Sequence, residues 1–187
     1  DIRLLGEAEK VKTNVEAPSS VALKPTDFHL LTPKMEVKVG DKVKAGSVLF
    51  HNKYNDSVKF VSPVSGEVTD ITRGAKRRIL EIIVKADAEN VYESSNVPNL
   101  EGMNADAVKE VLLKSGLWPF IKQRPIDIIA NPKETPKSIF ISGFDSSPLA
   151  PDIDFIVHGQ DQFIQKGIDV LSKLTEGKIH LNVKGNG

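Results

Sequence analysis

The sequence predicts a mixed fold, in which an all-β unit is followed by an α/β domain. Residues 1–87 contain short valine-rich runs separated by turn sequences, with little helical periodicity. Residues 104–187 instead alternate strand-like runs with two stretches of helical periodicity. A polar segment at 88–103 lies between these two textures and is expected to be a linker.

The composition excludes several classes of function. The chain has 187 residues, with 25 Lys and Arg against 25 Asp and Glu, so no global field favours nucleic acid. It has no cysteine, which removes disulfides, thiolate nucleophiles and Cys-ligated zinc or iron–sulfur clusters. No apolar run approaches the roughly 20 residues of a membrane-spanning helix. The sequence therefore predicts no membrane-spanning helix.

The first region reads as a compact β structure. Strand-like runs occur at 37–39, 47–50, 58–61 and 79–84. Between them lie the turn sequences Gly40-Asp41, Ala45-Gly46, Ser65-Gly66 and Arg73-Gly74. Glycine in these turns can adopt positive φ, and the intervening valines alternate toward a core.

The second region predicts a helix over 105–115, capped by Asn104 and ended by Gly116. Strands are expected at 126–130, 138–142 and 178–183, with a second helix over 160–175. Strand, helix, strand in this order indicates a parallel, Rossmann-like layer. Residues 151–158 fit either a strand or a helix. The chain stops just after its last strand-like run, so we expect this domain to continue beyond residue 187.

The most specific local pattern is VGDKVKAGSVL at 39–49, followed by SPVSGEV at 62–68. It resembles the barrel-sandwich hybrid of biotinyl and lipoyl carrier domains. In lipoyl domains the modified lysine lies eight residues before the proline of the second half-motif, a position that Asn55 occupies here. Lys53 and Lys59 are near, but neither is expected at the hairpin position. A carrier function is therefore disfavoured.

A longer resemblance covers nearly the whole chain. Seven blocks, at 33–41, 46–50, 62–66, 73–80, 115–125, 139–152 and 167–178, are similar in order to the A-subunit family of bacterial sodium-translocating NADH:quinone reductases. The resemblance implies a six-subunit complex that oxidises NADH, reduces ubiquinone and pumps sodium. It also implies a peripheral subunit on the cytoplasmic face of the inner membrane, associated with the membrane through partner subunits. Those partner subunits would hold FAD, FMN and iron–sulfur cofactors. Full-length members are more than twice as long.

Residues 100–187 also resemble, distantly, the flavin- and NADH-binding subunit of respiratory complex I. That family has a glycine-rich loop after a helix, where the backbone approaches the flavin phosphate. Here only Gly116 remains in the segment 115–125, which contains bulky aromatic residues and two prolines. A flavin- or nucleotide-binding electron-transfer module is the alternative function, and the lost glycines count against it.

The candidate site replaces that lost loop. Trp118 and Phe120 offer flat aromatic walls and Arg124 a donor, which suit a quinone head group or a partner surface. Phe144 and Asp145, in the loop that resembles the acidic loop of the complex I subunit, complete the set. The alternative is that Trp118 and Phe120 simply pack under the loop. We expect no catalytic residue, no bound redox cofactor and no metal site in this fragment.

Two further groups of residues have an ordinary interpretation. The four histidines, His29, His51, His158 and His180, show no metal-ligand spacing. Arg73, Lys76, Arg77 and Arg78 form the densest basic cluster, which is either a solvated hairpin end or a contact with anionic lipid or an acidic subunit face.

Overall fold

The computed structural model describes residues 9–94, 99, 102–147 and 150–185. The chain divides into two compact units, and each is described by itself. The β unit comprises residues 17–134. The α/β unit is described over residues 9–16, 135–147 and 150–185.

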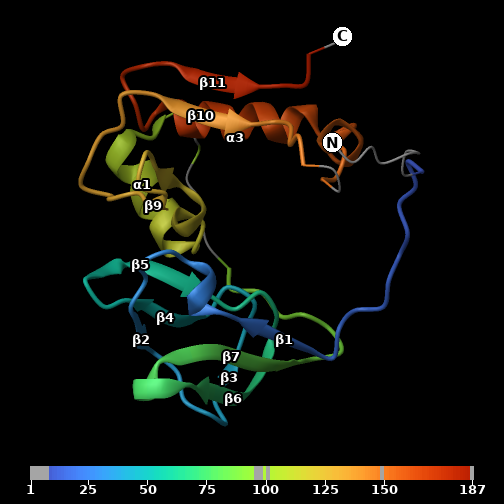
Figure 1. The fold of residues 1–187 in the computed structure, drawn as a ribbon, viewed down its shortest axis with the longest axis vertical. Helices are drawn as coiled ribbons and strands as arrows, with labels where there is room; N and C mark the ends of the chain where they lie inside the picture. The colour runs from blue at the N-terminus through green and yellow to red at the C-terminus, as the bar shows by residue number, and fades with distance from the viewer. Residues whose placement is uncertain (1–8, 95–98, 100–101, 148–149, 186–187) are drawn as a thin grey trace, which may run out of the picture. The chain divides into compact units, whose positions relative to one another are not determined.

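Two antiparallel sheets form the main body of the β unit, and they face one another in Figure 1. The four-stranded sheet has the order β1 (Ser20–Leu23), β7 (Ile79–Ala86), β6 (Gly66–Arg73) and β3 (Lys42–Val43). The three-stranded sheet has the order β2 (Pro33–Met35), β4 (Val48–Asn52) and β5 (Asn55–Val61). Short 3₁₀ turns lie at Pro25–Asp27 (η1) and Ala75–Arg77 (η2).

Most of the predicted strands are confirmed, with one correction. The runs at 47–50, 58–61 and 79–84 lie in β4, β5 and β7. The expected strand at 37–39 is wrong, because these residues lead into a turn. There the backbone N–H of Lys38 donates to the Asp41 carboxylate at 3.0 Å, and the N–H of Asp41 donates back to the Lys38 carbonyl. Local side-chain bonding of this kind competes with strand pairing.

The core lies between the two sheets. Phe50 and Phe60 stack with ring centroids 4.6 Å apart, and Phe28 meets Phe60 edge-on at 4.7 Å. Such aromatic pairs add about 0.5–1.5 kcal/mol beyond the area that they bury. Aliphatic side chains that are almost fully buried complete the core: Leu49, Val58, Val68, Ile82 and Val84.

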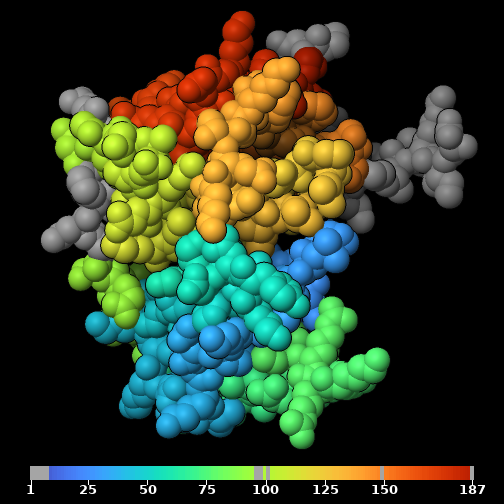
Figure 2. Space-filling model, turned by 90° about the vertical axis from the view of Figure 1, so that its left-hand side faces the viewer, coloured from blue at the N-terminus to red at the C-terminus, as the bar shows by residue number. Residues whose placement is uncertain are grey.

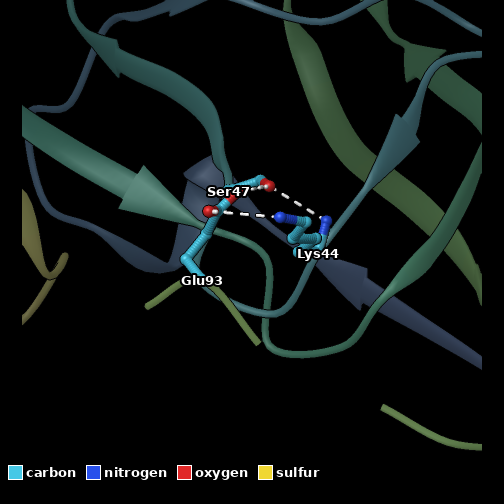
Figure 3. A network of polar contacts seen from close by, with 3 residues as sticks. All are labelled: Lys44, Ser47 and Glu93. Carbon is cyan, nitrogen blue, oxygen red and sulfur yellow. Dashed lines mark hydrogen bonds and ion pairs between the residues drawn. The ribbon is translucent and has the colours of Figure 1, made fainter. Parts of the chain in front are cut away.

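The chain that leaves β7 packs back onto the β unit before it continues. The Val91 N–H donates to the hydroxyl of the buried Ser65, and Tyr92 forms a parallel bridge with Ala45. The Glu93 carboxylate accepts from the Ser47 hydroxyl at 2.8 Å and lies 3.9 Å from the Lys44 amine (Figure 3). This first part of the predicted linker is therefore fixed, whereas residues 95–98, 100 and 101 lie outside the described residues.

The predicted helix over 105–115 is α1 (Ala105–Lys114). The Asn104 side chain accepts from the Ala107 N–H at 2.9 Å, as its predicted capping role requires. Gly116 has φ +71°, and the N–H of the following Leu117 donates to the Leu112 carbonyl, which forms a Schellman motif. The helix packs against β5 and belongs to the β unit.

A small hairpin follows α1. A 3₁₀ turn, η4 (Trp118–Phe120), precedes β8 (Lys122–Gln123) and β9 (Ile128–Ile129). The expected strand at 126–130 is thus shorter, and it pairs antiparallel with β8 instead of joining the parallel layer. The peptide bond between Arg124 and Pro125 in the connection is cis.

The α/β unit has a two-stranded parallel sheet of β10 (Ile139–Ser142) and β11 (Ile179–Asn182). The crossover contains α2 (Ile153–Val157) and α3 (Asp161–Ser172), and α3 packs against β11. The parallel strand–helix–strand order was predicted, and the ambiguous residues 151–158 contain the helix α2. None of the described helices is long and apolar enough to cross a bilayer.

Residues 9–16 are tied to this unit through α2. The Lys10 amine lies 2.7 Å from the carboxylate of Asp152, which also accepts from the Phe155 N–H as the N-cap of α2. The hydrogen bond from Lys10 and then that from the Phe155 N–H lower the pKa of Asp152 below its ordinary value. The carboxylate is therefore ionised at neutral pH, as a helix N-cap favours.

Candidate functional site

The segment 115–125 contains a single glycine, Gly116, where a nucleotide loop would have several. A Cβ at this position would lie 2.6 Å from Val61 Cγ2 of strand β5. Position 116 therefore requires glycine, because its φ is positive and because the backbone packs closely on the barrel. Because its bare side faces Val61, the need for glycine here does not depend on a phosphate.

Trp118 is a structural anchor for the segment. Its side chain is only 3% exposed, and its Nε1–H donates to the Ala130 carbonyl at 2.7 Å. The Ala130 N–H in turn donates to the Ile121 carbonyl at 2.9 Å. A buried indole normally needs such a partner. The indole thus packs under the loop, which was the alternative interpretation, and it fixes the residues on either side.

Phe120 differs sharply from Trp118. The Phe120 side chain is 74% exposed, and the neighbouring Leu117 and Ile126 are about half exposed. The Arg124 side chain is also exposed, and its Nη1 atom lies 3.6 Å from the Asp127 carboxylate. An exposed pair at this distance contributes little to stability. Phe120 and Arg124 are therefore available to a ligand or partner without loss of core packing.

The other two candidates lie in the α/β unit, at the end of β10. The Asp145 carboxylate accepts from the N–H and the hydroxyl of Ser147, at 2.8 and 2.7 Å. These two hydrogen bonds, the backbone one first, lower the pKa of Asp145 below its ordinary value. Phe144 is 40% exposed, and its carbonyl accepts from the Ser142 hydroxyl. The five candidates thus divide into three in the β unit and two in the α/β unit.

The hairpin between β4 and β5 corrects one expectation. Asn52 pairs with Asn55, so Lys53 and Tyr54 form the two-residue turn. A lysine does occupy the hairpin turn, two residues before the position counted back from Pro63. The position eight residues before Pro63 is not the turn here, because this chain has a longer segment between the hairpin turn and the second half-motif than lipoyl domains have.

The basic cluster lies on the surface of the β unit, and one of the four histidines, His51, lies in its core. The basic cluster lies at the exposed β6–β7 hairpin end around η2, which projects from the unit in green in Figure 2. His51 is buried, with Nδ1 2.5 Å from a Glu36 carboxylate oxygen. Within the described ranges, no cluster of three or more His, Asp or Glu side chains could hold a metal ion.

Both regions of the chain match domains of one protein family. Residues 1–87 match the NqrA N-terminal barrel-sandwich hybrid domain, and residues 103–187 match the NqrA second alpha/beta domain. The chain belongs to the NqrA family. The matches confirm the predicted barrel-sandwich hybrid and the predicted α/β domain.

Relatives of the NqrA family match over the full length of this chain. The A subunit of the Na(+)-translocating NADH-quinone reductase of Vibrio vulnificus (strain YJ016) is 34% identical over 187 residues, which cover 99% of this chain and 42% of that protein. Its counterpart from Histophilus somni (strain 129Pt) is 35% identical over 188 residues, with 100% and 42% covered. The Vibrio alginolyticus counterpart is 32% identical, with 99% and 42% covered. The chain thus spans less than half the length of these relatives.

Proposed function

We propose that this chain forms the N-terminal part of the peripheral A subunit of a Na+-translocating NADH:quinone reductase. Its role is structural and quinone-associated. The observation that carries the proposal is the agreement over the whole chain, at 32–35% identity, with proteins named as that subunit. The two family domains also follow one another directly in this chain, and only the short segment 88–102 separates their matches.

The redox chemistry of the complex is proposed to reside in partner subunits. The chain has no cysteine for an iron–sulfur cluster, and its counterpart of the nucleotide loop has one glycine, which packs on Val61. FAD, FMN and iron–sulfur centres of the other subunits would carry electrons from NADH to ubiquinone. The A subunit would then sit on the cytoplasmic face of the inner membrane through its partners.

Quinone association is proposed for the surface of the segment 117–125. The exposed Phe120 ring can stack on a flat quinone head group, and the Arg124 guanidinium can donate to a quinone carbonyl. Trp118 would position this surface from below, since its indole is held by Ala130. Phe144 and Asp145 would form a second contact surface on the α/β unit, toward quinone or a partner subunit.

A titration with a short-chain ubiquinone tests this surface, with the fluorescence of Trp118 as the signal. Trp118 is the single tryptophan and is 3% exposed, so collisional quenching by free quinone is suppressed. We expect saturable quenching by ubiquinone. The apparent Kd should rise at least about threefold in Phe120→Ala and in Arg124→Gln, as loss of one stacking or charged contact implies.

Matched controls are Phe163→Ala, which removes a ring that is 71% exposed, and Arg78→Gln, which removes an exposed cation. Both should leave the titration unchanged once inner-filter effects are corrected with free tryptophan. Quenching that never saturates, or that survives in the Phe120 and Arg124 variants, would contradict a quinone surface at 117–125.

A further inference from the structure

A polar groove of about 780 Å³ lies within the β unit. One wall is the β4–β5 hairpin, residues 51–58, together with Lys34 of the neighbouring strand β2. The other wall is the segment 129–133, which follows the β8–β9 hairpin. This volume is within the range of small-molecule sites, which is typically about 300–1,000 Å³.

Three lysines line the groove, each from a different segment: Lys34, Lys53 and Lys133. All three are exposed, and none has a carboxylate within ion-pair distance in the described part of the chain. Asp56 is the one acidic residue among the lining side chains that the structure describes. The chain as a whole is neutral, so the groove has a local excess of positive charge.

Asparagine side chains form hydrogen bonds within the hairpin wall. The side-chain Oδ1 of Asn52 accepts from the Tyr54 N–H at 3.1 Å, and the side-chain Oδ1 of Asn55 accepts from the N–H and hydroxyl of Ser57. Such side-chain bonds define the turn that contains Lys53. The Lys53 amine lies 6.0 Å from the Tyr54 ring centroid, which places an exposed aromatic ring beside the cation.

The second wall is fixed in the same manner. The Ala130 carbonyl is held by the Trp118 indole, and the Asn131 oxygen accepts from the Lys133 N–H at 3.1 Å. The two carboxylate oxygens of Glu134 accept from the side-chain amides of Asn131 and Gln123, both at 3.1 Å. Glu134 is therefore engaged by neutral donors and does not form an ion pair with Lys133.

We propose that this groove binds a phosphate-bearing ligand, with Lys34, Lys53 and Lys133 as its cationic contacts. Lysine amines are compact point charges that bind phosphate well, and three of them on separate segments suit a group with more than one negative charge. The apolar lining of Val58, Ile129 and Pro132 accommodates the organic part of the ligand. The phosphate belongs to a soluble ligand or to a phospholipid headgroup.

Isothermal titration with inorganic pyrophosphate tests the soluble source in low-salt buffer. The groove variant is the double substitution Lys53→Gln with Lys133→Gln. The control, Lys42→Gln with Lys85→Gln, removes the same charge from exposed positions on β3 and β7, outside the groove. We expect saturable binding that weakens at least about tenfold in the groove variant, as the loss of charged hydrogen bonds implies, and by less than about twofold in the control.

Co-sedimentation with vesicles tests the lipid source, with phosphatidylglycerol in phosphatidylcholine compared with phosphatidylcholine alone. Binding to the anionic vesicles that is lost in the groove variant but kept in the control, without pyrophosphate binding, assigns the headgroup as the source. Circular dichroism establishes that both double variants are folded. If neither probe binds, or if both double variants weaken binding alike, the proposal is overturned.

Discussion

Gly66→Ala is expected to destabilise the β unit by about 3 kcal/mol or more, enough to unfold a marginally stable domain. Gly66 has φ +155°, and a Cβ there would lie 1.9 Å from the carbonyl oxygen of Lys85. That carbonyl belongs to β7, where Ala86 is paired with Gly66. The clash is with sheet backbone, so relief requires separation of β6 from β7.

Urea denaturation followed by circular dichroism measures this effect. Gly40→Ala is the matched control, because Gly40 has φ +93° but a Cβ there would meet nothing within 4 Å. It should cost only about 1–2 kcal/mol, the strain of a left-handed conformation. Equal losses in the two variants would show that the approach to Lys85 is not what requires glycine at position 66.

Trp118→Ala is expected to lower the free energy of unfolding by about 3–5 kcal/mol, the usual range for a buried aromatic residue. The substitution removes an almost fully buried indole and leaves the Ala130 carbonyl without its donor. The segment that joins α1 to the β8–β9 hairpin would lose its anchor on the β unit. Circular dichroism must follow the unfolding, because the only fluorescent indole is lost.

Two neighbouring substitutions separate the contributions of packing and hydrogen bonding. Trp118→Phe keeps an aromatic ring but removes the donor, so it should cost less than Trp118→Ala. Phe120→Ala should change stability by less than about 0.5 kcal/mol, because the Phe120 ring is 74% exposed. A large loss in Phe120→Ala with a small one in Trp118→Ala would reverse the roles assigned to these two side chains.

Local signals in the sequence predicted the local features of this fold. Asn104 and Gly116 determine the two ends of α1 through hydrogen bonds within a few residues, and such short-range chemistry is readable from sequence. The runs of β4, β5 and β7 were likewise recognisable, because they are rich in β-branched and aromatic residues and are bounded by turn sequences. The turn at Gly40-Asp41 was also predicted, but its hydrogen bonds reach back to Lys38 and so replace the expected strand at 37–39.

Features that depend on distant contacts could not be predicted. The packing of α1 on β5 places this helix in the β unit. The hydrophobic periodicity of a helix shows that it has an apolar face but does not show which element packs against that face. The burial of Trp118 depends on Ala130, twelve residues away, which accepts its N–H. The groove lysines are separated by up to about a hundred residues, so their convergence is visible only in the folded chain.

Residues 1–187 are proposed to form the N-terminal region of a reductase A subunit. A chimera tests this role most directly. In the chimera, this chain replaces the matching region of the Vibrio vulnificus relative, and the protein is expressed in cells that lack their own A subunit. We predict that the chimera co-purifies with the other subunits and restores Na+-stimulated quinone reduction by NADH, and that Phe120→Ala with Arg124→Gln lowers it. A folded chimera that fails to join the complex would contradict the account.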